Sequence, residues 1–252
     1  GGKLTDTLIQ TSSGKNTFDI NGSTKATVVG GSEEDKLVIT NAVTGGEYSL
    51  GAGNDTIDLD NAATDGKGTF KLGSGNDSVQ VDGTLTDATI YLGAGTDTIT
   101  VAGKTSTSTI QTADGTNIFS LQSADTITLQ AGSGNDSVDL SAASKNSSYV
   151  LGDGKDEIVI DGTSDDDLIQ GQSGNDTINI KGVATASTIY GGDGTDSIKL
   201  DAAASKVVIS DAQGISDITL ASGGADLKVT LGDSSDTITV GNAGTGLTTS
   251  DI

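Results

Sequence analysis

The segment GAGNDTIDL occupies residues 51–59 and joins a glycine-rich turn to a run of alternating apolar residues. Versions of it recur along the chain, among them GSGNDSVQV at 73–81, GAGTDTITV at 93–101, GSGNDSVDL at 132–140 and GDGTDSIKL at 192–200. The acid of the turn, or the residue in its place, serves as a register mark. The marks are Asn16, Asp35, Asp55, Asp77, Asp97, Asn117, Asp136, Asp156, Asp176, Asp196, Ser216 and Asp236. Eleven steps cover 236 − 16 = 220 residues, so the mean step is 20 and the chain is a repeat protein.

Two apolar columns accompany the marks. The second and fourth residues after every mark are apolar, as at Ile57 and Leu59, although only 33% of the chain is hydrophobic. This alternation is typical of a strand. A second column lies seven residues before each mark: Ile9, Val28, Tyr48, Phe70, Ile90, Ile110, Leu129, Tyr149, Ile169, Ile189, Ile209 and Val229. The pattern therefore predicts a second strand in every coil.

A coil of two short strands cannot bury its own apolar face, so successive coils must stack around one shared core. Parallel stacking places equivalent residues about 4.8 Å apart. The sequence thus predicts an all-β, right-handed parallel β-solenoid of about twelve coils of about 20 residues, with two short strands per coil. An antiparallel sandwich is the alternative, but its hairpins would not repeat every strand in the same order at a fixed spacing.

The two turns of each coil differ in how much their length varies. Across the glycine-rich turn the two apolar columns are always nine residues apart, as from Ile9 to Phe18 and from Phe70 to Val79. All variation in length falls in the opposite turn, which is longest between Leu59 and Phe70. We therefore expect the glycine-rich turn to be under geometric constraint, and residues 60–68 to bulge outward as a surface loop.

Stacking the constrained turn builds a ladder of nine Asp, two Asn and one Ser. Neighbouring carboxylates at strand spacing would repel each other by roughly 3 to 4 kcal/mol at an effective dielectric constant of 20. The chain has no His or Cys, so a bound metal must take oxygen ligands, which calcium prefers. Asx-turns without metal are the alternative reading of the same residues.

A row of calcium ions, Ca²⁺, is the favoured reading, with ligands from the marks and from glycine carbonyls of the turn. The neutral marks Asn16, Asn117 and Ser216 are expected to give weaker sites. The candidate ligands are Asn16, Asp35, Asp55, Asp77, Asp97, Asn117, Asp136, Asp156, Asp176, Asp196 and Asp236, with Gly51, Gly53, Gly73, Gly75, Gly93, Gly95, Gly132, Gly134, Gly152, Gly154, Gly174, Gly192 and Gly194.

The turn resembles the hemolysin-type nonapeptide G-G-x-G-x-D-x-U-x of RTX calcium-binding repeats, in which U is a large apolar residue. Residues 191–199 (GGDGTDSIK) match it fully, whereas most other copies have Leu in place of the first Gly. The resemblance implies an RTX-like β-roll that binds several calcium ions, as in the repeat regions of bacterial surface-layer proteins. Such rolls carry calcium on both sides, but here only one side keeps the glycines and the acid. We expect one row of ions, with an extra site near Asp167, which lies nine residues before Asp176.

The composition bounds the classes of partner. The formal net charge of −22 excludes nucleic-acid phosphates and favours cations. No apolar run is long enough to span a membrane, and residues 1–9 lack a signal peptide, so any export signal is expected outside this sequence. The chain lacks Arg and His, which argues against a polysaccharide-processing enzyme. We expect no enzymatic activity.

We expect residues 1–252 to form a single RTX-like solenoid domain within a longer, exported bacterial protein. The favoured function is that of a calcium-dependent structural protein of the cell surface, a surface-layer or surface-fibre building block that assembles with copies of itself. The alternative is the calcium-triggered folding and secretion module of a type I-secreted toxin or enzyme. Ice binding would need a regular outward threonine ladder, and the positions beside the first core column, such as Glu157 and Lys199, do not form one.

Overall fold

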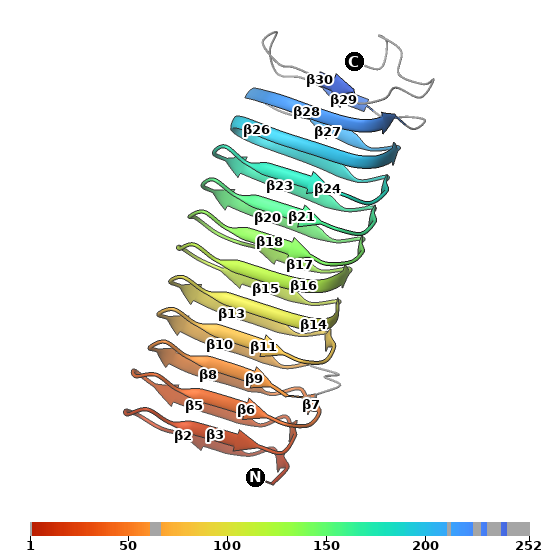
Figure 1. Ribbon diagram of the computed structural model, residues 1–252. Coiled ribbons are helices and arrows are strands. Elements are labelled where there is room, and N and C mark those ends of the chain that lie inside the picture. Colours follow the sequence, from red (N-terminus) through yellow and green to blue (C-terminus); the bar gives the residue numbers. More distant parts are fainter. Residues whose placement is uncertain (1, 61–66, 211–212, 224–227, 231–237, 241–252) are drawn as a thin grey trace. The chain divides into compact units, whose positions relative to one another are not determined.

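The computed structural model describes residues 2–60, 67–210, 213–223, 228–230 and 238–240. The chain divides into two compact units, Gly1–Leu129 and Gln130–Ile252, and each is a stack of coils (Figure 1). The fold is an all-β parallel β-solenoid of about ten turns with about 20 residues per turn, which confirms the predicted fold class. In the part of the chain that the structure describes, no helix has the length and hydropathy needed to cross a membrane.

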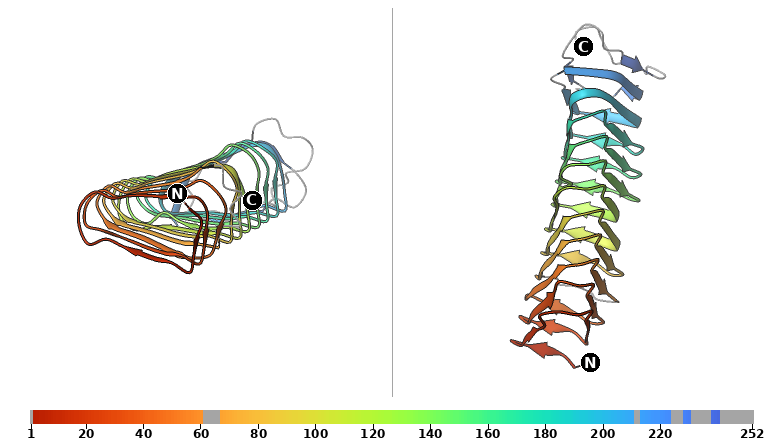
Figure 2. Two further views of the ribbon diagram at one scale, coloured as in Figure 1. Left: turned by 90° about the horizontal axis from the view of Figure 1, so that it is seen from below. Right: turned by 90° about the vertical axis from the view of Figure 1, so that its left-hand side faces the viewer.

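In the first unit, strands before the glycine-rich turn form an entry sheet and strands after it form an exit sheet (Figure 2). The entry strands are β2 (Leu8–Gln10), β5 (Thr27–Gly31), β8 (Glu47–Ala52), β10 (Thr69–Ser74), β13 (Thr89–Ala94), β15 (Thr109–Thr112) and β17 (Thr128–Gln130), the last at the division between the units. The exit strands are β3 (Thr17–Ile20), β6 (Lys36–Ile39), β9 (Thr56–Leu59), β11 (Ser78–Val81), β14 (Thr98–Ser106) and β16 (Ile118–Asp125).

The second unit repeats the arrangement. Its entry strands are β20 (Ser148–Asp153), β23 (Leu168–Ser173), the first part of β26 (Thr188–Ser205), β27 (Val208–Ser210) and β29 (Lys228–Thr230). Its exit strands are β18 (Ser137–Leu140), β21 (Glu157–Ile160), β24 (Thr177–Ile180), the later part of β26, β28 (Gln213–Gly223) and β30 (Ile238–Val240).

Strand register confirms the two apolar columns. On the entry sheet Phe70 pairs with Tyr48 in the coil before it and with Ile90 in the coil after it. On the exit sheet Val79 pairs in parallel with Ile57 and Ile99. All six side chains are buried, so a fixed period-two pattern places these apolar faces in the core.

The edge opposite the glycine-rich turn, here called the far edge, is more regular than the sequence predicts. It contains a third strand of two residues in most coils, so the expectation of two strands per coil was incomplete. These strands are β1 (Leu4–Thr5), β4 (Ser23–Thr24), β7 (Val43–Thr44) and β12 (Leu85–Thr86) in the first unit, and β19 (Ser144–Lys145), β22 (Ser164–Asp165) and β25 (Ala184–Thr185) in the second. A left-handed residue follows the strand, for example Lys25 at φ 52° or Asp87 at φ 53°. The signal is weak because the inward residue changes in type from coil to coil, from Ser23 and Ser144 to Val43 and Leu85.

The long far turn between Leu59 and Phe70 includes residues 61–66, which lie outside the described residues, so its predicted outward bulge stays a prediction. Next to it the rings of Tyr48 and Phe70 stack with their centroids 4.9 Å apart. Gly68 makes room for this pair, because a Cβ there would come within 3.0 Å of the Phe70 ring.

Candidate metal centre

The glycine-rich turn needs backbone conformations that side chains resist. Gly73 has φ 115° and Gly75 has φ 134°, and the equivalent glycines of the other coils are similar. A Cβ on either residue would also overlap a carbonyl oxygen of the preceding coil, on Gly51 or Gly53. Glycine therefore lets consecutive turns stack in close contact, with their carbonyl oxygens lined up along the edge. Gln172 adopts φ 83° at a position where other coils have glycine, so the motif tolerates one exception.

The acids of the turn form a continuous hydrogen-bonded ladder within each unit. The Asp55 N–H donates to Oδ1 of Asp77 at 2.7 Å, and the Asp77 N–H donates to Oδ1 of Asp97 at 2.9 Å. In the second unit the bonds from Asp136 to Asp156, from Asp156 to Asp176 and from Asp176 to Asp196 measure 2.7, 2.9 and 2.8 Å. One oxygen of each receiving carboxylate is thus held by the backbone of the coil before it.

The second carboxylate oxygen is the exceptional atom. The ladder carboxylates are at most 2% exposed. Within the described residues, the Oδ2 atom is buried and has no hydrogen-bond partner in five of them: Asp55, Asp77, Asp97, Asp156 and Asp176. Leaving a buried charged acceptor unmatched is costly, so a positive partner at this edge would stabilise the repeated set of such oxygens. Asp35 is different, because its Oδ2 accepts a 2.8 Å hydrogen bond from the Gly31 N–H.

The proton affinity of the ladder reflects this burial. Desolvation raises the pKa of Asp77 to about 7 and those of Asp156 and Asp176 to about 6, and neighbouring ladder carboxylates add to the effect. Burial also raises the pKa of Asp55 and Asp97. Without a cation, these carboxyl groups of the folded chain therefore keep their protons at pH values where aspartates exposed to water have already released theirs.

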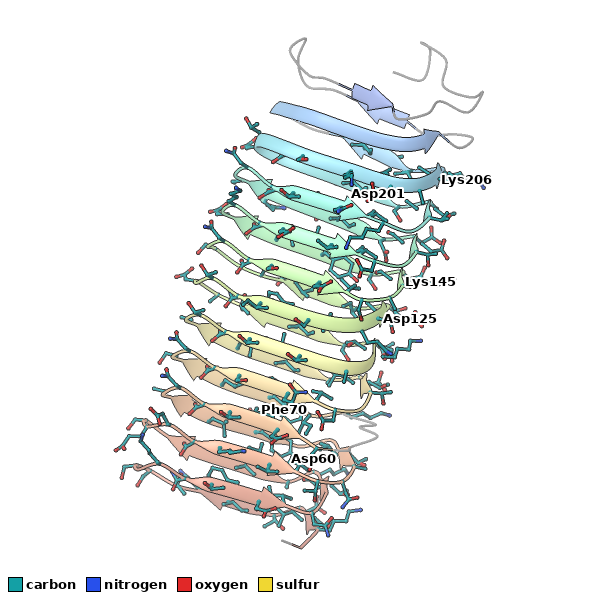
Figure 3. All side chains as sticks on the ribbon, in the orientation of Figure 1. Asp60, Phe70, Asp125, Lys145, Asp201 and Lys206 are labelled. Carbon is teal, nitrogen blue, oxygen red and sulfur yellow. The ribbon has the colours of Figure 1, made fainter. Side chains whose placement is uncertain are left out.

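The lysines do not supply the positive charge. In the described part of the chain their ion pairs lie on the surface and join them to partly exposed acids. Lys15 pairs with Glu34, Lys71 with Glu47 and Lys104 with Asp125, in each case one coil away. Figure 3 places Asp125 and Lys145 on the far edges of their own units. These pairs link neighbouring coils but leave the buried ladder unneutralised.

The candidate ligand atoms at this edge are carboxylate and backbone carbonyl oxygens, which suit a cation that prefers oxygen ligands. No group of three or more acidic, His or Cys side chains gathers at one point among the described residues, because the acids are spread one per coil. A cation would therefore need glycine carbonyls as well as Asp oxygens, which is the mixture that calcium accepts. The described Asp marks from Asp35 to Asp196 and their glycines share this edge, while Asn16 and Asn117 occupy it with amides. Asp236 lies outside the described residues.

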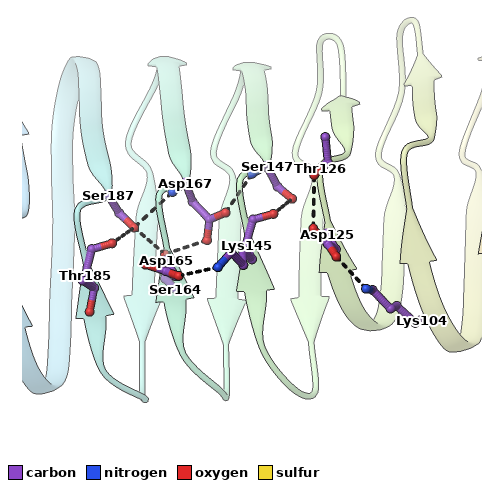
Figure 4. Close-up of polar contacts among 10 residues, drawn as sticks. All are labelled: Lys104, Asp125, Thr126, Lys145, Ser147, Ser164, Asp165, Asp167, Thr185 and Ser187. Atoms are coloured by element: carbon purple, nitrogen blue, oxygen red, sulfur yellow. Dashed lines mark hydrogen bonds and ion pairs between the residues drawn. The ribbon is translucent and has the colours of Figure 1, made fainter.

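Asp167 occupies the far edge, away from this ladder, and its surroundings differ. Its Oδ1 accepts the Ser147 N–H at 2.9 Å and its Oδ2 accepts the Ser164 hydroxyl at 2.8 Å (Figure 4). Ser187 Oγ lies 3.2 Å from the Asp167 nitrogen and 2.9 Å from Ser164 Oγ. The carboxyl is buried, which raises its pKa, but both of its oxygens have protein partners. The contacts therefore do not call for a cation here.

Sequence reasoning missed a second, outer ladder of amides. Asn76 Oδ1 accepts the Thr96 N–H at 2.9 Å, and Asn54 Oδ1 accepts the Asn76 N–H at 2.8 Å. Asn135 and Asn175 make the same bond in the second unit. The available signal was the Asn that directly precedes Asp in the turns reading GND. These amides accept hydrogen bonds from the backbone of the next coil on the exposed side of the same turn.

Comparison with known proteins supports the fold. No family model and no curated protein sequence matches the chain. Among solved structures, the chain is similar to a hyperactive, Ca²⁺-dependent, β-helical antifreeze protein from an Antarctic bacterium. The TM-score is 0.62 and the identity 19%, over 100% of this chain and 86% of that one. A hyper-glycosylated TibA fragment also matches, with a TM-score of 0.35 and 12% identity over 97% of this chain and 100% of that one, and we draw nothing from it.

Proposed function

We propose that this chain is a calcium-dependent structural solenoid. The observation that carries the proposal is the ladder of buried carboxylates, five of which have an Oδ2 atom without a partner. Bound calcium would neutralise the ladder and join consecutive coils, with Asp oxygens and turn glycine carbonyls as its ligands. The calcium dependence of the similar antifreeze protein agrees with this assignment.

A structural role at the bacterial cell surface, as a surface-layer or fibre component that assembles with copies of itself, is our preferred setting. The support is physical: the chain carries a regular repeat with little chemistry beyond carboxylates, and the net charge of −22 would be offset by an extracellular supply of calcium. We propose no catalytic activity. The alternative is a calcium-triggered folding and secretion module attached to a type I-secreted toxin or enzyme.

Calorimetric titration of calcium into protein stripped with chelator tests the metal assignment, with magnesium as the comparison ion. We expect several calcium ions per chain and much weaker binding of magnesium, which needs an octahedral site and retains its water. Absence of calcium binding would overturn the assignment.

Electron microscopy of the calcium-loaded protein then separates the two settings. Sheets or filaments that disperse on chelation support the surface-assembly role. A uniformly monomeric solenoid that folds only with calcium supports the secretion-module alternative.

Ice binding is a second candidate, because one outward column of the first unit does contain stacked threonines. On the entry sheet Thr89 pairs with both Thr69 and Thr109. Ice-growth inhibition by the wild-type chain would be lost in Thr89→Lys and kept in Thr98→Lys, which alters the exit sheet instead. The adjacent column, with Lys71 and Tyr91, is not regular, so ice binding ranks below the calcium-dependent structural role.

A further inference from the structure

Two of the register marks are asparagines, and they stand in turns of a distinct sequence. The turns TSSGKN (11–16) and TADGTN (112–117) have Thr five residues before the mark and no Gly four residues before it. In the described turns whose mark is Asp, the residue five positions before is Gly30, Leu50, Leu72, Leu92, Ala131, Leu151, Gly171 or Gly191. Thr and Asn therefore occur together, twice, and in no described Asp turn.

Asn117 makes the same Oδ1 contact as the ladder carboxylates, but its second side-chain atom is a nitrogen with different partners. Its side chain is fully buried, and its Oδ1 accepts the Asp97 N–H at 3.0 Å, as the ladder carboxylates do. Its Nδ2 donates to the hydroxyl of Thr112 at 3.1 Å and to the carbonyl of Gly115 at 3.2 Å. The amide nitrogen thus takes the position of the oxygen that has no partner in Asp97.

Asn16 makes the corresponding bond at the beginning of the first unit. Its Nδ2 donates to the Gly14 carbonyl at 2.6 Å and to Oδ1 of Asp35 at 2.8 Å. Gly14 and Gly115 are both the glycine two residues before the mark. Thr11 differs from Thr112 in that its hydroxyl donates to the Val29 carbonyl at 3.4 Å. The bond from the amide to the glycine carbonyl is what the two turns share.

An amide NH₂ group is a hydrogen-bond donor and cannot coordinate a cation. In these turns the amide nitrogen also donates a hydrogen bond to the glycine carbonyl oxygen that would be a metal ligand in an Asp turn. Compared with Asp at the same position, Asn carries no negative charge, and its amide nitrogen lies where a cation would otherwise lie. In the turn of Asn117, the Thr112 hydroxyl also accepts a hydrogen bond from that nitrogen. Each change makes a bound ion unnecessary.

Resting on the calcium function proposed above, we propose that the turns of Asn16 and Asn117 are built to stay free of metal, with the amide nitrogen in the place of the ion. This replaces the sequence-based expectation that their oxygens act as weak ligands. In chain order eight of the nine Asp marks then form two blocks of four, bounded by Asn16, Asn117 and Ser216, and Asp236 follows Ser216. The blocks are Asp35, Asp55, Asp77 and Asp97, followed by Asp136, Asp156, Asp176 and Asp196. Calcium would bind in two separate groups.

Native mass spectrometry of the calcium-saturated chain tests this proposal by counting ions. Asn117→Asp should bind at least one ion more than the wild type. Asn76→Asp is the matched control, because it adds the same charge to an exposed residue of the outer ladder and should leave the count unchanged. The reverse variant, Leu92→Thr with Asp97→Asn, should bind at least one ion fewer.

The outcomes separate the two proposals. A wild type without bound calcium would overturn the proposed function itself. A wild type that binds calcium, with the same count in Asn117→Asp, would show that Asn117 already serves as a ligand and would overturn the metal-free turn. If Asn117→Asp does not fold, the reverse variant decides: an unchanged ion count overturns the proposal.

Discussion

Asp97 on the glycine-rich edge and Asp167 on the far edge are both buried aspartates, and both accept a backbone N–H of a neighbouring coil on Oδ1. They differ at Oδ2. Asp97 has no partner for this atom, whereas Asp167 has the hydroxyl of Ser164. Burial raises the pKa of both, so burial alone does not distinguish a metal ligand from a structural acid. The unmatched second oxygen, repeated along one edge, is the difference on which the proposed calcium assignment rests.

Removal of calcium should have the largest effect on this molecule. Each site saturated at 100 times its dissociation constant contributes about 2.7 kcal/mol to folding, and the emptied ladder adds repulsion between buried carboxylates. We expect the thermal unfolding midpoint, followed by circular dichroism, to fall in excess chelator at pH 7.5 and to be restored by calcium. An unchanged signal and melting temperature without metal would mean that the ladder needs no cation.

The pH dependence of the metal-free chain should be the next largest effect. Asp77, with a pKa of about 7, and Asp156 and Asp176, at about 6, bind protons more tightly when folded than when unfolded. Between about pH 4 and pH 7 the unfolded chain releases protons that the folded chain keeps, so stability falls as the pH rises. Thermal unfolding of stripped, desalted protein should give a higher midpoint at pH 4.5 than at pH 7.5. The opposite order would contradict the account.

A matched pair of glycine substitutions compares the backbones of the two edges. Gly75 has φ 134°, and in Gly75→Ala the new Cβ would overlap the Gly53 carbonyl oxygen. We expect the free energy of unfolding to fall by more than about 3 kcal/mol. Gly45 on the far edge has φ 72° and its nearest atom lies 3.6 Å from the new Cβ, so Gly45→Ala should cost about 1–2 kcal/mol. Denaturant unfolding in calcium measures both. Equal losses would show that the edges are equally constrained.

The smallest and most specific effect separates the two aspartates themselves. Asp97→Asn should lower the number of calcium ions bound by at least one, because it removes a ligand. Asp167→Asn should leave the number of bound ions unchanged, because the carboxylate oxygens of Asp167 already accept hydrogen bonds from Ser164 and Ser147. Calcium titration of both variants makes the comparison. A loss of ions in Asp167→Asn would restore the extra site that the sequence predicted there.

The sequence was sufficient for the stacking because a strict nine-residue spacing and paired apolar columns allow one register, as Phe70 and Val79 illustrate. It was insufficient for the far edge, where the inward residue changes from Ser23 to Val43 and Leu85, and strands of two residues carry no periodic signal. Asp167 shows the same limit, because a match to a nonapeptide spacing cannot reveal the serine hydroxyls that meet its carboxylate. The role of Asn117 likewise depends on Thr112 and Gly115, which become informative only when their contacts are known.

A crystal structure grown with calcium, with the ions located by anomalous scattering, tests the central claim most directly. The account predicts peaks along the glycine-rich edge beside Oδ2 of Asp55, Asp77 and Asp97 in the first unit, and of Asp156 and Asp176 in the second. It predicts no peak beside Asp167. Peaks confined to the far edge, or a glycine-rich edge without ions at saturating calcium, would contradict it.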